Sequence, residues 1–453
     1  MTESSVPLRS IPHSDPVDAV VTVPGSKSLT NRALLIAALA SGESVLRGAL
    51  DSEDTRIMAD ALRQIGVPLE MEDFDHRIHL SGESLLSNNP TGAKSPRPDF
   101  NPEKTTDLYV GNSGTTARFL TAALSFLPGR WRILGKERMY SRPIGDLIDA
   151  LSGFGAVIET EREKGYPPLL IQGKRLPGGK ITVRGGISSQ FLSGLLMAAP
   201  LADGDVTIQI EGELVSRPYV EMTLAVMKTF GVEVITDEEF RSFRIPADSS
   251  YRGTDYAVEP DASAASYFFA LPAIVGGRTT VRGLSKGSLQ GDVDFVEILE
   301  AMGCHVTWGT DGVTVERPIR NGRPLELNGV DVDMNDISDT VQTLSVVALF
   351  AATPTRIRNV AHIRGKETDR ISAVVTELRK FGIRVDEFPD GLQIWPDRTR
   401  IHGAQIATYD DHRMAMSFSL AGLAVPGVTI ENPDCVVKTY PRFFEDLEKV
   451  IRI

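Results

Sequence analysis

Residues 23–40 read VPGSKSLTNRALLIAALA, in which a proline–glycine turn with hydroxyl groups and two cations leads into an apolar segment. The apolar segment predicts a buried helix. The first backbone N–H groups of a helix have no partner within it, and the helix dipole adds positive potential there. Lys27 and Arg32 add full charges beside Ser26 and Ser28, so the turn is predicted to bind an anion. A serine-capped turn without a ligand is the alternative when this stretch is considered alone.

The same pattern recurs along the chain. Five further segments combine a polar lead with an apolar helix, a turn and a short strand, and their leads are residues 111–118, 185–190, 259–263, 335–340 and 409–413. A second type of helix alternates with the first and ends in a glycine that precedes a strand. These glycines are Gly66, Gly155, Gly231, Gly303 and Gly382. Their spacing of about 75 residues predicts six copies of one repeat, the sixth completed by a strand from the N-terminus.

Length and composition favour a two-lobed cytoplasmic protein. A chain of 453 residues with 42 % hydrophobic residues suits two or three domains, and six repeats divide into two lobes of three. Every apolar run is interrupted within about 15 residues, which argues against a membrane span. Residues 1–16 contain acids and no apolar signal core. The two cysteines, Cys304 and Cys435, are far apart in the sequence, so no disulfide framework is predicted.

The charge pattern favours a small anionic ligand. The net charge of −12 argues against a nucleic-acid partner. Cations nevertheless recur in the helix leads and connecting motifs, at Lys27, Arg32, Arg118, Arg142, Lys366, Arg370, Arg413 and Lys438. A basic cleft in an acidic protein focuses its field on a small, multiply charged anion. Scattered solvated charges are the alternative for any one of these residues.

Three further motifs suggest contacts to such an anion. Gly114 lies in a loop of glycine and hydroxyl residues, which allows a ligand to approach the backbone closely. Arg142 precedes a proline and has the fork geometry that suits a carboxylate or phosphate. Residues 188–190 (SSQ) begin the third apolar helix and offer hydroxyl, amide and N–H groups, whereas a simple helix cap would use only one of them. Residues 216–219 (SRPY), which begin with Ser216, occupy the position in their repeat that Arg142 occupies in the preceding one.

Asp339 is a candidate proton acceptor. The charged segment 366–370 (KETDR) belongs to the same repeat and can be brought beside it. A carboxylate near lysine and arginine stays ionised and is able to take a proton. If the segment is helical, Lys366 and Arg370 share one face, with Glu367 next to it. A surface pattern of alternating charges is the alternative.

Other polar residues suggest no cofactor. Asp261 and Asp410 precede apolar helices and are predicted to cap them. The seven histidines form no H-x-x-x-H pair, so no metal site is predicted. Neither a G-x-G-x-x-G fingerprint nor a Walker loop is present, so no dinucleotide cofactor is predicted.

These segments together resemble one family, the 5-enolpyruvylshikimate-3-phosphate synthases, over nearly the whole chain. The resemblance rests on residues 24–28 with Arg32, 111–115, 142–145, 188–191, 333–335 with Asp339, 366–370, 411–416 and 438–439. It implies an α/β (α+β) fold, a two-lobed inside-out α/β barrel with six βαβαββ repeats, three per lobe. Helix N-termini would point at a cleft between lobes that closes around the substrates. We expect the first lobe at residues 25–252 and the second at residues 1–24 and 253–453.

The resemblance also implies a reaction and its residues. The enolpyruvyl group of phosphoenolpyruvate would pass to the 5-hydroxyl of shikimate 3-phosphate through a tetrahedral intermediate, in aromatic amino-acid biosynthesis. Asp339 would deprotonate the hydroxyl, and Glu367, aided by Lys27, would move the proton at the methylene carbon. The residues implied for shikimate 3-phosphate are Lys27, Ser28, Arg32, Ser188, Ser189, Ser216, Asp339, His362 and Lys366. Those implied for phosphoenolpyruvate are Lys27, Gly114, Arg142, Gln190, Arg370, Arg413 and Lys438.

Two positions depart from the family pattern, and a third suggests a subtype. His362 stands where the family usually has asparagine. The resemblance still implies that it forms a hydrogen bond to the shikimate hydroxyls. The loop at residues 87–106 is longer than expected and is assigned a structural role. Gly114 implies the glyphosate-sensitive subtype, because a side chain there would crowd an inhibitor bulkier than phosphoenolpyruvate.

Two other functions are compatible with this scaffold. The related transferase that acts on UDP-N-acetylglucosamine typically carries a cysteine on a mobile loop and lacks the SSQ motif of residues 188–190 in this form. A non-catalytic protein that binds phosphometabolites or RNA on the same scaffold would not need Asp339 and Glu367 beside cations. We expect a monomer that acts on small molecules and has no membrane or nucleic-acid partner.

Overall fold

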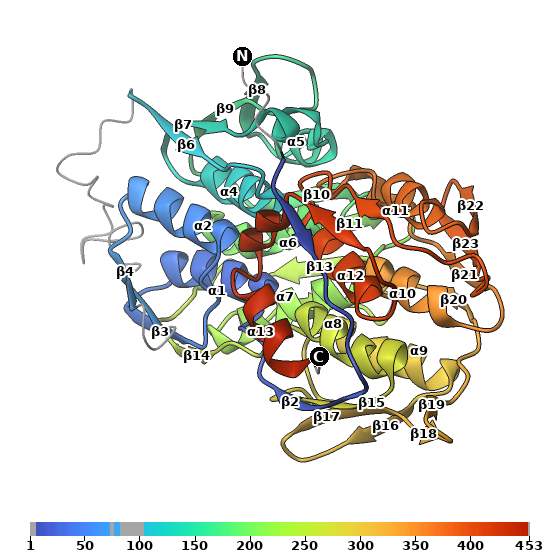
Figure 1. Cartoon of the computed structure of the whole chain (residues 1–453). Coiled ribbons are helices and arrows are strands. Elements are labelled where there is room, and N and C mark those ends of the chain that lie inside the picture. The colour runs from blue at the N-terminus through green and yellow to red at the C-terminus, as the bar shows by residue number, and fades with distance from the viewer. Residues whose placement is uncertain (1–5, 73–76, 82–103, 452–453) are drawn as a thin grey trace. The chain divides into compact units, whose positions relative to one another are not determined.

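The structure, a computed structural model, describes residues 6–72, 77–81 and 104–451 (Figure 1). The chain forms two compact units. The first unit is Gly25–Val258, and the second unit combines the N-terminal residues up to Pro24 with the chain from Glu259 onward. The boundary after residue 252 that we expected differs from this division by a few residues. Strand β14 (Asp255–Ala257) explains the difference, because it pairs in parallel with β3 (Glu43–Arg47) of the first unit.

Three four-stranded sheets form the first unit. Their strand orders are β14–β3–β5–β4, β6–β7–β9–β8 and β10–β11–β13–β12. The remaining strands are β4 (Leu69–Glu72), β5 (Arg77–Ser81), β6 (Thr105–Tyr109), β7 (Gly129–Leu134), β8 (Val157–Thr160), β9 (Leu169–Gly173), β10 (Gly179–Arg184), β11 (Val206–Glu211), β12 (Ile235–Thr236) and β13 (Ser242–Ile245). In each sheet the first two strands are parallel and the others antiparallel, which is the βαβαββ pattern of one repeat.

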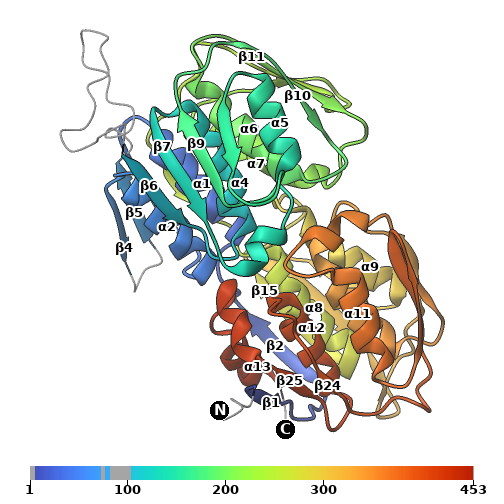
Figure 2. The ribbon, with the colours of Figure 1, turned by 90° about the horizontal axis from the view of Figure 1, so that it is seen from above.

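Two sets of helices alternate in the first unit. The inner helices are α1 (Lys27–Leu39), α4 (Gly114–Phe126) and α6 (Ser189–Ala198), and the outer helices are α2 (Glu53–Gln64), α5 (Gly145–Gly153) and α7 (Arg217–Thr229). Short 3-10 helices are η1 (Glu137–Ser141) and η2 (Ala199–Leu201). Every residue of α4 is buried, and a helix with no solvated face must be covered on all sides. Helices α4 and α6 pack against each other, and Figure 2 shows strands such as β4, β7 and β11 at the periphery of this unit.

The second unit repeats this plan. Its sheets have the orders β16–β17–β15–β2, β20–β21–β23–β22 and β1–β25–β24, with a separate β18–β19 hairpin. The strands are β1 (Leu8–Ser10), β2 (Val17–Val21), β15 (Gly277–Arg282), β16 (His305–Trp308), β17 (Gly312–Arg317), β18 (Ile319–Arg320), β19 (Arg323–Pro324), β20 (Asp331–Asp333), β21 (Thr355–Arg358), β22 (Arg384–Phe388), β23 (Gly391–Trp395), β24 (Gln405–Ile406) and β25 (Thr429–Glu431). Strand β1 pairs antiparallel with β25, which confirms that the N-terminus completes the sixth repeat.

The helices of the second unit also form an inner and an outer set. The inner helices are α8 (Ala262–Val275), α10 (Val341–Val347) and α12 (His412–Gly422), and the outer ones are α9 (Phe295–Met302), α11 (Arg370–Arg379) and α13 (Phe443–Val450). The 3-10 helices are η3 (Gly291–Asp294), η4 (Ser338–Thr340), η5 (Ala348–Phe350), η6 (Ala361–Gly365) and η7 (Pro433–Lys438). All residues of α8 and α12 are buried, so buried helices with outer sheets form an inside-out α/β barrel in this unit as well.

The glycines that suggested the repeat have the expected conformation. Gly303 ends α9 at a φ of 114°, a left-handed value that a residue with a side chain rarely adopts. Gly66, Gly155, Gly231 and Gly382 have positive φ as well. Each unit therefore repeats one helix ending and encloses its own hydrophobic core.

The expected loop at residues 87–106 is described only at its end. Residues 87–103 lie outside the described residues, and Thr105 and Thr106 already belong to β6. Within the part of the chain that the structure describes, no helix combines the length and hydrophobicity needed to cross a bilayer.

Candidate functional site

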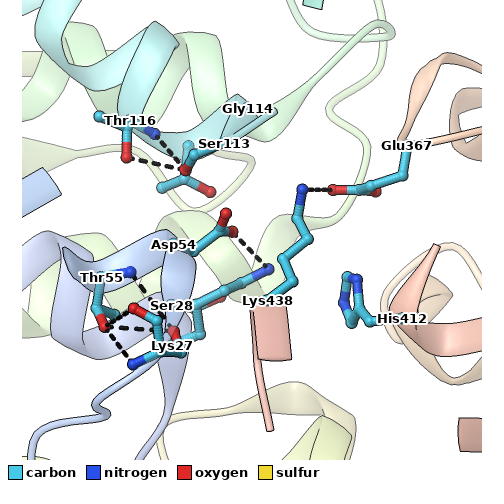
Figure 3. A network of polar contacts seen from close by, with 12 residues as sticks. Lys27, Ser28, Asp54, Thr55, Ser113, Gly114, Thr116, Glu367, His412 and Lys438 are labelled. Atoms are coloured by element: carbon cyan, nitrogen blue, oxygen red, sulfur yellow. Dashed lines mark hydrogen bonds and ion pairs between the residues drawn. The ribbon is translucent and has the colours of Figure 1, made fainter. Parts of the chain in front are cut away.

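The first unit places Lys27 at the start of α1, beside a carboxylate. Ser26 caps this helix and accepts a hydrogen bond from the backbone N–H of Leu29 at 3.4 Å, which confirms the predicted helix start. The Nζ atom of Lys27 lies 3.7 Å from Oδ2 of Asp54 (Figure 3). Asp54 was not singled out from the sequence, because an acid in the first turn of a helix, here α2, is usually read as a cap. The pair directs the lysine side chain and leaves its ammonium hydrogens able to reach a second anion.

Arg32 is a buried cation held by neutral groups. Its side chain donates hydrogen bonds to Thr223 Oγ1 at 2.7 Å, to Ser193 Oγ at 3.2 Å, and to the carbonyl oxygens of Ser28 and Tyr219. Only 2 % of Arg32 is exposed, and no carboxylate among the described residues contacts it. Burial lowers the pKa of Arg32 to about 10. A buried positive charge without a carboxylate partner is well placed for an anionic ligand.

Gly114 makes room for two arginine side chains. Arg142 donates to the carbonyl oxygen of Asn112 at 2.8 Å, and Arg118 donates to that of Pro143 at 2.9 Å. A Cβ atom added to Gly114 would lie 2.3 Å from Nη2 of Arg142 and 2.7 Å from Nη1 of Arg118. Figure 3 shows Gly114 next to Ser113, which caps α4. The glycine therefore lets both guanidinium groups approach the start of this helix.

The start of α6 supplies neutral polar groups. Ser188 caps α6 and accepts from the N–H of Gln190 at 3.3 Å, so the helix cap uses one of the two serines. The amide of Gln190 donates to Thr115 Oγ1 at 3.3 Å, which connects the starts of α6 and α4. Ser189 is buried, and Ser216 precedes α7 in a left-handed conformation with φ 54°. A non-glycine residue in this region stores strain that often occurs at ligand sites.

The second unit holds Asp339 between two arginines. Oδ1 of Asp339 accepts from Nη1 of Arg370 at 3.0 Å, and Oδ2 accepts from Nη2 of Arg413 at 2.6 Å. The Asp339 side chain is 13 % exposed, whereas both arginine side chains are more deeply buried. The structure thus brings Asp339 beside Arg370, as the sequence predicted. Two cations favour the ionised form of this carboxylate.

Arg370 connects the other acids of this cluster. Its guanidinium group donates to Glu367 Oε2 and to Asp411 Oδ2, each at 2.8 Å. Burial alone would lower the pKa of Arg370, but Asp411, Glu367 and Asp339 raise it above its ordinary value. Nζ of Lys438 lies 3.5 Å from Oε1 of Glu367 (Figure 3). Glu367 is therefore a buried carboxylate between two cations.

The helical arrangement considered for residues 366–370 is wrong. Asp369 caps α11 and accepts from the N–H of Ser372 at 3.1 Å, so the helix begins only at Arg370. Lys366 is extended and ends the 3-10 helix η6. Lys366 and Arg370 therefore do not share a helix face, although Glu367, just before the helix, still forms a local ion pair with Arg370 three residues later.

The predicted cap at Asp410 is also wrong, whereas the cap at Asp261 is confirmed. Asp261 accepts from the N–H of Ala264 at 2.8 Å. At α12 the cap is Asp411, which accepts from the N–H of Arg413 at 2.9 Å, while Asp410 has a left-handed φ of 55°. Two adjacent acids gave no basis for choosing between them from the sequence. The outcome matters because Asp411 also anchors Arg370.

His362 lies beside the Asp339 segment. Its Nε2 is 2.9 Å from Oγ of Ser338, the residue before Asp339. Burial, followed by the charge of Lys366, lowers the pKa of His362 to about 4. The ring is therefore neutral at physiological pH, and like an asparagine side chain it offers both a donor and an acceptor.

The two clusters have different electrostatic character. In the first unit the cations Lys27, Arg32 and Arg142 outnumber the carboxylates, with Asp54 beside Lys27. In the second unit Arg370, Arg413 and Lys438 each contact a carboxylate. The first cluster is suited to binding anions, and the second to moving protons while its net charge stays low.

Comparison with known proteins identifies the family. The family described as "EPSP synthase (3-phosphoshikimate 1-carboxyvinyltransferase)" matches residues 11–447. A relative from Nostoc sp. named 3-phosphoshikimate 1-carboxyvinyltransferase is 47 % identical over 436 residues, which cover 96 % of this chain and 97 % of the relative. A relative of the same name from Vibrio cholerae is 46 % identical over 96 % of this chain and 97 % of its own.

Solved structures show the same fold. A structure of EPSP synthase from Acinetobacter baumannii is similar with a TM-score of 0.77 and 27 % identity, and the match covers 98 % of each chain. The enolpyruvyl transferase NikO from Streptomyces tendae, at 19 % identity and a TM-score of 0.74, shows the fold alone. The family match over most of the length and the near-complete relatives agree, and the chain belongs to the EPSP synthase family, the 3-phosphoshikimate 1-carboxyvinyltransferases.

Proposed function

We propose that the chain transfers the enolpyruvyl group of phosphoenolpyruvate to the 5-hydroxyl of shikimate 3-phosphate and releases inorganic phosphate. Family membership supports this reaction, which serves aromatic amino-acid biosynthesis. One structural observation carries the proposal: the carboxylates Asp339 and Glu367 are both bound by one buried guanidinium group, that of Arg370. Addition followed by elimination needs three proton transfers: from the 5-hydroxyl, to C3, and back from the methyl group. Asp339 is placed to accept the first, and Glu367, which enters the reaction protonated, is placed to carry the other two.

The chemical steps balance with these two carboxylates. Asp339 takes the proton of the 5-hydroxyl while the oxygen bonds to C2 of phosphoenolpyruvate. Glu367, aided by Lys27, delivers a proton to C3, which gives the tetrahedral intermediate. The same group then removes a proton from the new methyl group, the C2–O bond to phosphate breaks, and the double bond forms. Each step is general acid–base catalysis, with cations stabilising the developing charge.

The remaining residues are proposed to bind the two substrates. Shikimate 3-phosphate is assigned to Lys27, Ser28, Arg32, Ser188, Ser189, Ser216, Asp339, His362 and Lys366. Phosphoenolpyruvate is assigned to Lys27, Gly114, Arg142, Gln190, Arg370, Arg413 and Lys438. The excess of cations in the first unit supports this assignment, because the substrates together carry two phosphates and two carboxylates. Cations and N–H dipoles must outweigh the repulsion between these anions.

The test is phosphate release from phosphoenolpyruvate with two acceptors in parallel. We expect release with shikimate 3-phosphate and none with UDP-N-acetylglucosamine. Release with UDP-N-acetylglucosamine alone would assign the chain to the other transferase activity. If the folded protein were silent with both acceptors, the proposed reaction would be wrong.

Substitution of Gly114 tests the role assigned to Arg142. In Gly114→Ala the new methyl group would overlap Nη2 of Arg142. The Arg142 side chain is buried and its Nη1 donates to the Asn112 carbonyl oxygen, so the guanidinium group has to shift and strain this hydrogen bond. We expect the KM for phosphoenolpyruvate to rise about tenfold, because a displaced charged hydrogen bond costs about 1.4 kcal/mol or more. Inhibition by glyphosate should weaken in the same variant, and steady-state kinetics measures both effects.

Gly153→Ala is the matched control. A Cβ at Gly153 meets nothing within 4 Å, and the residue ends α5. Its kinetics should match those of the unmodified enzyme. An unchanged KM for phosphoenolpyruvate in Gly114→Ala would contradict the assignment of Arg142, and millimolar glyphosate resistance of the unmodified enzyme would contradict the glyphosate-sensitive subtype.

The proposal includes a monomer that works in the cytoplasm. Cys304 and Cys435 are both buried as free thiols, which suits a reducing compartment. Light scattering of the purified protein tests the monomer, because a mass near twice 49.3 kDa would exclude it.

A further inference from the structure

Asp292 is a buried acid that the proposed steps do not use. It lies in η3 and is 4 % exposed. The hydroxyl of Ser263 donates a hydrogen bond to its Oδ2. Burial of a carboxyl group is unfavourable unless nearby groups replace its hydration, so its position requires a physical reason.

The start of α8 holds Asp292 in place. Gln290 accepts a hydrogen bond from the backbone N–H of Ala262 at 3.1 Å, and its amide donates to the carbonyl oxygen of Pro260 at 2.7 Å. Ser263, the second residue of α8, holds the carboxyl group itself. The segment 290–292 is thus attached to α8 at several points. The Asp292 carboxyl group therefore cannot turn away without breaking a buried hydrogen bond.

Asp292 lies within electrostatic reach of Asp339 and Arg413. Helix η3 packs against η4, which carries Asp339, and both pack against α8. The charge of Asp339 opposes ionisation of Asp292, and the charge of Arg413 favours it. Arg413 in turn donates to Oδ2 of Asp339 at 2.6 Å. Asp292 and Asp339 are therefore two carboxyl groups in the field of one arginine.

The surrounding charges make Asp292 titrate near neutrality. Burial, followed by the charge of Asp339, raises the pKa of Asp292 to about 7. Asp261 at the start of α8 acts in the same direction, whereas Ser263 and Arg413 oppose it. Asp294, on η3 as well, interacts with Glu297 and Asp336 instead.

We propose that Asp292 is a positioning residue for the transfer reaction: while negatively charged, it draws on the field of Arg413 and strengthens Asp339 as a proton acceptor. The proposal rests on the assigned role of Asp339 as the base toward the 5-hydroxyl. A second negative charge near Asp339 makes its protonation more favourable, and neutralisation of Asp292 removes this help. The proton passes from the hydroxyl to Asp339, and Asp292 itself exchanges none with the substrate.

The variant Asp292→Asn tests the charge at constant shape. Asparagine retains an oxygen that can accept from Ser263 but never ionises. We expect kcat to fall about tenfold at pH 8, where the wild-type Asp292 is charged, and less than about twofold at pH 6, where it is mostly neutral. A unit charge changes the proton affinity of a neighbouring carboxylate by about one to two pKa units, and part of this change lowers the energy of the transition state. In the wild type, kcat plotted against pH should rise near pH 7, and in the variant this rise should be absent. The KM values of both substrates should be nearly unchanged.

Two further variants separate charge from structure. Asp294→Asn removes the same charge from the same helix, and its pH profile should match that of the wild type. In Ser263→Ala the acid remains but loses the hydrogen bond that lowers its pKa, so the rise in kcat should shift to higher pH. This variant decides the question if Asp292→Asn does not fold, because an unshifted rise contradicts the proposal.

Other outcomes are distinct from a failure of the assigned reaction. An equal loss of kcat at both pH values in Asp292→Asn would indicate a purely structural role and overturn the inference. A pH dependence of kcat in this variant identical to that of the wild type would overturn it as well. Absence of phosphate release from the wild-type enzyme would instead overturn the proposed function.

Discussion

Asp339→Asn is expected to lower kcat by about a thousandfold, with the KM of each substrate changed by less than about tenfold. The asparagine side chain has the same shape, and its oxygen can still accept a hydrogen bond from Arg370 or Arg413. It cannot take a proton from the 5-hydroxyl. The loss should therefore affect the chemical step, which pre-steady-state measurement of phosphate release would show directly.

Asp336→Asn is the matched control for this prediction. Asp336 is an exposed acid three residues before Asp339 on the same connection. The substitution removes one negative charge, as Asp339→Asn does, and should leave kcat unchanged. If Asp339→Asn retained more than about a tenth of the wild-type kcat, Asp339 would not be the base, and Glu367 would become the candidate for all three proton transfers.

Arg32→Met should remove binding of shikimate 3-phosphate and leave the free protein folded. The guanidinium group is buried among neutral partners, and loss of a charged hydrogen-bonding group from an anion site raises KM by about a hundredfold or more. The Thr223 hydroxyl, which accepts from Arg32, still has hydrogen-bond partners when the arginine is removed. This hydroxyl is hydrogen-bonded to Ser193 Oγ at 2.9 Å and to the Tyr219 carbonyl oxygen at 2.8 Å.

The stability of this variant follows from the pKa of Arg32. Burial lowers the pKa of Arg32 in the folded state to about 10, below its ordinary value. Below pH 10 the arginine is charged in both states, so its burial disfavours folding by the full amount at neutral pH, of the order of 3 kcal/mol. The cost declines only as pH rises above about 10, where the folded state loses the proton of Arg32 before the unfolded state does. Removal of the charge therefore should not destabilise the ligand-free protein at pH 7.

Thermal melting with and without shikimate 3-phosphate measures both effects. The wild type should gain melting temperature on addition of the ligand, and Arg32→Met should not. Arg56→Met removes an exposed arginine from α2 and should behave like the wild type. A normal ligand-induced shift in Arg32→Met would show that Arg32 does not hold this substrate.

The repeat architecture was predictable because its signals are local. An apolar helix after a glycine or acidic turn, and a glycine at the end of the next helix, depend on residues close in sequence. Gly303 illustrates this, since its left-handed φ follows from the absence of a side chain. An N-terminal strand that completes the sixth repeat was also predicted, and the structure shows it as β1, which pairs with β25 and covers what would otherwise be an open sheet edge.

The candidate site was predictable in residue type but not in all its contacts. Asp54 carried no signal in the sequence, and only the packing of α1 against α2 places it 3.7 Å from Lys27. Lys366 was assigned to a helix face, although the Asp369 cap starts that helix four residues later. The choice between Asp410 and Asp411 depended on backbone angles that two adjacent acids do not reveal.

The sequence by itself determined the six repeats, the family and the residue types from which the site is proposed. Local helix and turn preferences, together with motif spacing, are contained within short stretches of chain. Only the tertiary structure decided which distant charges meet: Arg370 with Asp339 and Asp411, and Arg413 with Asp339. These contacts join segments far apart in the sequence. Their strength depends on burial, which lowers the local dielectric and exists only once the units are packed.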